Sequence, residues 1–127
     1  MKRLFKGASL YLILLQILSV IYSSPSQAVT EVTIAFQGPL TGPESYIGIP
    51  ELNGAKYAIN KFNASSTQYK VLLTAIDDQG DPAVANTVSP SAALNSKIIG
   101  VIGPAYSGAT IAALPYYKQT NLPLISP

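Results

Sequence analysis

The stretch KIIGVIGPAYSGAT, residues 97–110, joins an apolar run to a glycine-containing turn and then to the start of a helix-like segment. The apolar residues of its first half do not alternate with polar ones, which is typical of a strand buried on both faces of a parallel sheet. A strand that passes through a short turn into a helix is the repeating unit of α/β proteins. The same unit recurs along the chain.

Four strands are predicted to alternate with three helices, joined by short links. The strands fall at residues 32–36, 69–76, 97–103 and 122–126, and the helices at 50–62, 83–95 and 107–120. This order predicts an α/β fold, with a parallel sheet, right-handed crossovers and helices on both faces. The second strand is expected to be buried on both faces, and Pro90 is expected to kink or split the second helix. Four tyrosines are expected to be core or half-buried: Tyr57, Tyr69, Tyr116 and Tyr117.

The N-terminus has the pattern of a secretory signal peptide. Lys2, Arg3 and Lys6 precede a 13-residue apolar run at 10–22, and small residues lead to Ala28. We expect residues 1–28 to be a signal peptide cleaved after Ala28, with residues 29–127 forming the exported part. An uncleaved membrane anchor is the alternative, although the run is shorter than the roughly 20 residues of a spanning helix.

Charge and composition exclude several classes of function. From residue 29 onward the chain has five basic and six acidic residues, so nothing in it favours nucleic-acid binding. The 127 residues contain no cysteine and no histidine, which excludes disulfides and Ser-His-Asp or Cys-His catalysis within them. We therefore expect a protein that is not an enzyme and needs no cofactor.

The turn at residues 103–108 is the strongest candidate for a ligand site. Gly103 and Gly108 have the spacing of a phosphate-binding loop, but Ala109 stands where that loop needs its lysine. The N–H groups at a helix N-terminus also suit a carboxylate, to which Ser107 would add a hydroxyl and Tyr106 an aromatic wall. The alternative is that Ser107 only caps its own helix.

The remaining candidates lie in the first two loops. Asp77, Asp78 and Asp81 could hold a metal, but their spacing is not that of an EF-hand. The structural interpretation is favoured, with Asp81 as a helix N-cap and the other two as a solvated strand end, and no metal site is predicted. Tyr46, in the first loop, could reach a ligand.

Taken together, VTIAFQGPLTGPESYIG, GAKYAINKFN, DDQGDP, VIGPAYSGAT and NLPLISP resemble the start of the periplasmic binding proteins for branched-chain amino acids. These are the type I solute-binding receptors of ABC importers. The resemblance covers residues 32–127 and implies two α/β lobes joined by a hinge, of which this chain supplies the first part of the first lobe. It further implies that Ser107 and neighbouring backbone amides, including those of Ala105 and Gly108, hold the carboxylate of an amino acid or amide. The implied partner is an ABC permease, and the implied location is extracytoplasmic.

The chain departs from that family at two places. A tyrosine often precedes the glycine that matches Gly48, but here Ile47 takes that place and Tyr46 stands one residue earlier. Some members bridge the second and third loops by a disulfide; Gly80 and Tyr106 occupy those places here, so no such bridge exists. A ligand-sensing domain of the same fold and a secreted Rossmann-like enzyme remain as alternative functions. Because no helix follows the last strand to cover the sheet, a longer protein is expected.

Overall fold

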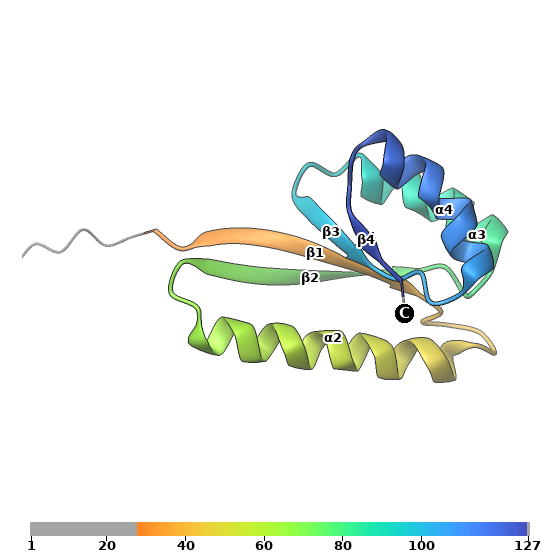
Figure 1. Ribbon diagram of the computed structural model, residues 1–127. Helices are drawn as coiled ribbons and strands as arrows, with labels where there is room; N and C mark the ends of the chain where they lie inside the picture. Colours follow the sequence, from red (N-terminus) through yellow and green to blue (C-terminus); the bar gives the residue numbers. More distant parts are fainter. Residues whose placement is uncertain (1–27, 127) are drawn as a thin grey trace, which may run out of the picture.

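The computed structural model describes residues 28–126, in which strands and helices alternate along the chain (Figure 1). The predicted signal peptide lies outside the described residues, except for Ala28 itself. Among residues 28–126, no helix has both the length and the apolar character needed to cross a membrane. The elements are β1 Thr30–Gly38, α2 Ser45–Ser65, β2 Tyr69–Asp77, α3 Pro82–Ala93, β3 Ile98–Ile102, α4 Ser107–Gln119 and β4 Leu124–Ile125.

The four strands form one parallel sheet in the order β2-β1-β3-β4. The first strand of the chain is therefore an inner strand, flanked by β2 and β3. In Figure 1, α2 lies along one face of the sheet, while α3 and α4 pack side by side over the other. The predicted α/β fold with a parallel sheet and helices on both faces is confirmed.

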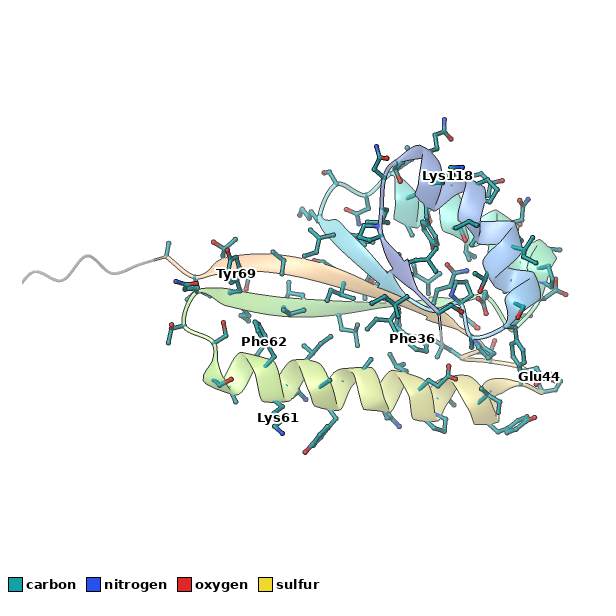
Figure 2. All side chains as sticks on the ribbon, in the orientation of Figure 1. Phe36, Glu44, Lys61, Phe62, Tyr69 and Lys118 are labelled. Carbon is teal, nitrogen blue, oxygen red and sulfur yellow. The ribbon has the colours of Figure 1, made fainter. Side chains whose placement is uncertain are left out.

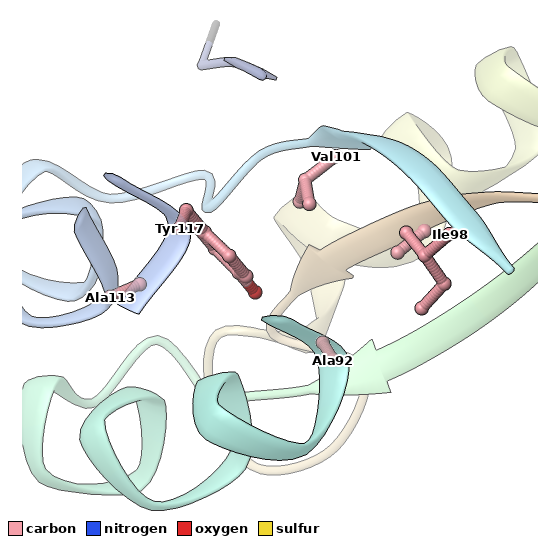
Figure 3. Packing of buried hydrophobic residues seen from close by; sticks show 6 residues of the cluster. Ala92, Ile98, Val101, Ala113 and Tyr117 are labelled. Atoms are coloured by element: carbon pink, nitrogen blue, oxygen red, sulfur yellow. The ribbon is translucent and has the colours of Figure 1, made fainter. Parts of the chain in front are cut away.

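Each face of the sheet has its own apolar core. Phe36, Leu52 and Ala55 form the smaller cluster, and Figure 2 shows Phe36 between the sheet and α2. The larger cluster lies under α3 and α4, where alanines let the two helices approach the sheet closely (Figure 3). Its buried members are Ala35, Ala92, Ile98, Val101, Ala113 and Tyr117.

A polar network crosses the core beneath α3 and α4, and the sequence pattern did not predict it. The side-chain amide of Gln37, fully buried at the end of β1, donates to Asp78 Oδ2 at 3.2 Å. The side-chain carbonyl oxygen of Gln37 accepts from Ser89 Oγ at 3.2 Å and from the Tyr117 hydroxyl. Because each partner of this network is satisfied, it joins β1, α3 and α4 without leaving an unpaired buried group.

Two predictions about exposure were wrong. The second strand was expected to be buried on both faces, but β2 is an edge strand of the described sheet and none of its residues is fully buried. Tyr69 on that strand is 48% exposed, and Tyr57 on α2 is 71% exposed. Tyr116 and Tyr117 are half-buried and buried, as expected.

Prolines mark element boundaries less sharply than predicted. The first helix begins at Ser45 rather than at Pro50, which therefore lies inside α2. The carbonyl that loses its helical donor there belongs to Tyr46, which is exposed, so water can satisfy it. The second helix likewise continues through Pro90 as one element, and it is not split. The residue four positions earlier, Asn86, is also exposed.

Candidate ligand site

The first three strands bring three loops together at their carboxyl ends, the edge at which open parallel sheets bind ligands. The loops comprise residues 39–44, 78–81 and 103–106. At the loop bases, Asp78 N donates to the carbonyl of Gly38 at 3.1 Å. The residue before each helix lies in one of these three loops, so α2, α3 and α4 all begin at this edge of the sheet.

The N-terminus of α4 is open to solvent. The helix begins at Ser107, Tyr106 occupies the N-cap position, and no side chain makes a capping hydrogen bond there. Ser107 and Gly108 are both exposed. The hypothesis that Ser107 serves only as a cap is therefore wrong, because the capping residue precedes it. The first N–H groups of α4 and the Ser107 hydroxyl can together donate hydrogen bonds to an anion such as a carboxylate.

The turn leading to Ser107 is held in place by close packing and by hydrogen bonds. Gly103 has φ +96°, and a Cβ there would lie 2.0 Å from the carbonyl oxygen of Gln37, so only glycine fits. The carbonyl of Pro104 accepts from Thr110 Oγ1 at 3.1 Å and from Ser126 Oγ at 2.8 Å. These contacts join the turn to the first turn of α4 and to the end of β4.

Asp77 is not the solvated strand end that was predicted. Its Oδ1 accepts from the backbone N–H groups of Leu40 at 2.9 Å, Gln79 at 3.0 Å and Thr41 at 3.3 Å. Its Oδ2 accepts from the Thr41 hydroxyl. Partial burial raises the pKa of Asp77, but these hydrogen bonds outweigh burial and hold the pKa below its ordinary value. Asp77 therefore fastens the first loop to the second.

Asp78 and Asp81 have different roles in the second loop. Asp78 is fully buried, which also contradicts the predicted solvated strand end. Burial raises the pKa of Asp78, although hydrogen bonds from the N–H of Gly80 and the amide of Gln37 offset part of that effect.

Asp81 Oδ1 accepts from Ala83 N at 2.6 Å, with Pro82 as the first residue of α3, so the predicted N-cap is confirmed. Within residues 28–126, no three acidic side chains gather closely enough to hold a metal ion.

Tyr106 contacts the neighbouring loops. Its hydroxyl donates to Glu44 Oε2 at 2.6 Å, and this hydrogen bond, with some burial, raises the pKa of Tyr106 to about 12. Figure 2 shows Glu44 at this end of the molecule, where α2 begins. Tyr46 lies on the first turn of α2 and is 68% exposed, while Ala105 is half-buried in the turn itself. Contact of any of these side chains with a ligand stays a prediction.

Glu44 and Thr110 are the members of this edge that the sequence did not suggest. Glu44 precedes a helix whose start was predicted five residues too late, so the sequence pattern placed Glu44 in a loop and predicted no role for it. Thr110 stands in the first turn of α4, where a hydroxyl pointing back at the preceding carbonyls is a recognisable pattern. That pattern was the available signal.

Comparison with known proteins agrees with the observed fold. A family model described as "Periplasmic binding protein" matches residues 31–127. The chain belongs to the periplasmic binding protein family. The family is one of binding proteins, in agreement with the expectation that the chain is not an enzyme. Its description also agrees with an extracytoplasmic location.

Individual relatives of this periplasmic binding protein carry amino-acid names. An "Amino acid binding protein" of Pseudomonas aeruginosa is 28% identical over 99% of this chain and 33% of its own length. The "Leucine-, isoleucine-, valine-, threonine-, and alanine-binding protein" of the same organism is 31% identical over 84% of this chain and 29% of its own. Among solved structures, the branched-chain amino acid transporter substrate binding protein LivJ of Streptococcus pneumoniae, in complex with isoleucine, superposes with a TM-score of 0.71. It is 30% identical over 76% of this chain and 28% of LivJ. The chain thus spans about a third of the length of these relatives.

Proposed function

We propose that the chain is the first part of the first lobe of a solute-binding protein that captures a branched-chain amino acid, or a similar amino acid or amide, for an ABC importer. The observation that carries this proposal is the uncapped N-terminus of α4, with Ser107 exposed at the carboxyl edge of a parallel sheet. The amino-acid names of the relatives and the isoleucine of the LivJ complex support the choice of ligand.

The ligand carboxylate would lie against the start of α4. The Ser107 hydroxyl and the N–H groups of the first turn, including that of Gly108, would donate to its oxygens, and the partial positive charge of the helix would favour the anion. The ligand would bind between this lobe and a second one. Because it would contact both lobes only when they are closed, it would shift the protein towards the closed state. A permease would then recognise that state.

The experiment that tests the proposal replaces Ser107 by alanine in the complete protein. Binding of leucine, isoleucine and valine is measured by calorimetry. Loss of one hydrogen bond to a charged group should cost about 1.5–3 kcal/mol, which is roughly a 10- to 150-fold weaker affinity. Ser96→Ala is the matched control, since Ser96 is an exposed serine at the amino end of β3. If the Ser107 variant keeps full affinity, the proposed site is wrong. If wild type binds none of these ligands, the proposed function is wrong.

We further propose that residues 1–28 direct export and are removed, so that the protein acts outside the cytoplasm. The charged start, short apolar run and small residues before Val29 support this. N-terminal sequencing of the protein recovered outside the cytoplasm should begin at Val29. A first residue of Met1 would instead indicate a retained anchor.

A further inference from the structure

One side chain touches all three loops of the candidate site. The hydroxyl of Tyr106, in the third loop, donates to Glu44 Oε2 in the first loop at 2.6 Å, across 62 residues of sequence. Its ring lies over Gly80 in the second loop, where a Cβ would stand 3.0 Å from Cδ2 and 3.1 Å from Cε2. Gly80 has φ +72°, so both its conformation and its missing side chain suit this contact.

These contacts join the beginnings of the helices. Glu44 immediately precedes α2 and Tyr106 immediately precedes α4, so their hydrogen bond ties the two helix starts together. A Cβ at Gly108 would lie 3.0 Å from Cγ of Pro82, the first residue of α3. The start of α4 thus contacts the starts of both α2 and α3.

The contacts of Tyr106 with Glu44 and Gly80 lie next to the proposed ligand contact at Ser107 but do not occupy it. Tyr106 is the N-cap residue of α4, with φ −112° and ψ 138°, and Ser107 follows it directly. The orientation of Tyr106 therefore sets the direction in which the Ser107 hydroxyl and the first free N–H groups point. The phenolic proton is already donated to Glu44, so the same proton cannot serve a ligand.

We infer that Tyr106 is a positioning residue, which orients the Ser107 turn for ligand through its hydrogen bond to Glu44 and its contact with Gly80. This inference rests on the proposed function for the ligand, but the restraint itself is independent of any ligand. It assigns to Tyr106 a role different from the aromatic wall expected from the sequence.

The first experiment measures the restraint without ligand. Tyr106→Phe keeps the ring over Gly80 and removes only the donor, and hydrogen exchange is followed at the amides of residues 110–113, the first of which donates to the carbonyl of Tyr106 at 2.9 Å. Loss of a hydrogen bond to a charged acceptor should speed their exchange roughly 10-fold. Tyr57→Phe is the matched control, since Tyr57 is 71% exposed on α2, and it should leave these amides unchanged. Unchanged exchange in Tyr106→Phe would overturn the inference.

The second experiment measures leucine binding by calorimetry in the complete protein. Tyr106→Phe and Glu44→Ala should each weaken binding roughly 10-fold, and the double variant no further, because both remove the same bond. Glu44→Gln keeps an acceptor oxygen and should restore most of the affinity. If Tyr106→Phe weakens binding while exchange at residues 110–113 is unchanged, the phenol contacts the ligand itself and the positioning role is wrong. If wild type binds no amino acid, the proposed function fails, and the exchange result alone decides the role of Tyr106.

Discussion

The carboxylate of Asp77 joins two loops that are distant in sequence. It accepts from the Thr41 hydroxyl and from backbone N–H groups of Leu40, Thr41 and Gln79. Asp77→Asn removes the charge and one acceptor oxygen, and should lower the free energy of unfolding by about 1 kcal/mol at neutral pH. Urea unfolding of wild type and variant measures this difference.

The effect of Asp77 should depend on pH in a defined direction. Its folded-state pKa lies below the ordinary value of 3.8, so the folded state prefers the ionised form. The stabilisation is therefore fully present above about pH 5 and is lost as pH falls below 3.8 through the folded pKa. The difference between wild type and Asp77→Asn should accordingly shrink in acid. A difference that stays constant down to pH 3 would show that the charge does not matter. The pKa of Asp78 is raised chiefly by burial and in part by the charge of Asp77, so Asp77→Asn also changes the titration of Asp78.

At the scale of single residues, local signals were predictable and distant ones were not. Asp81 could be assigned as an N-cap because its partners, Ala83 and Val84, follow within three residues. The partners of Asp77 in the first loop are 36 and 37 residues away, so only the folded sheet brings them together. The hydrogen bond from Tyr106 to Glu44 was hidden for the same reason.

Among the secondary-structure elements, α3 offers the clearest test of a local signal. Asp81→Ala removes the side-chain acceptor for the first N–H groups of the helix and should destabilise the protein by about 1 kcal/mol. Asp81→Asn keeps a capping oxygen and should lose much less. Urea unfolding followed by circular dichroism measures both variants. Equal losses in the two would indicate that the charge, rather than the cap, stabilises α3.

Element order and type followed from the sequence, while boundaries and exposure did not. Apolar runs and helical spacing defined four strands and three helices, because burial imposes these periods on the sequence. The start of α2 at Ser45 was missed, since Pro50 imitates a first-turn proline. The exposure of β2 was missed because its edge position depends on strand order, which a single strand's composition does not encode.

For the molecule as a whole, the face covered by α2 remains partly open. A groove of about 380 Å³ lies between α2 and the strands β1, β3 and β4, lined by Phe36, Glu51, Gly54, Ala55, Ala58, Ile102, Gly103 and Ile125. Residues 29–127 should therefore enhance the fluorescence of the apolar dye ANS, which binds exposed hydrophobic surface. Ala58→Glu places a charge in the groove and should reduce the enhancement several-fold. Ala83→Glu, at an exposed position on α3, is the control. An equal response of both variants would place the dye elsewhere.

The strand order also has a consequence for the time course of synthesis. β1 leaves the ribosome first, yet its two neighbours are residues 69–77 and 98–102. At about 5–20 residues per second, the 59 residues between Gly38 and Ile98 take roughly 3–12 seconds to make. During that interval β1 lacks at least one of its two neighbours, so the sheet cannot be complete. If residues 1–28 direct export, as proposed above, this delay keeps the sheet incomplete while the chain crosses a membrane.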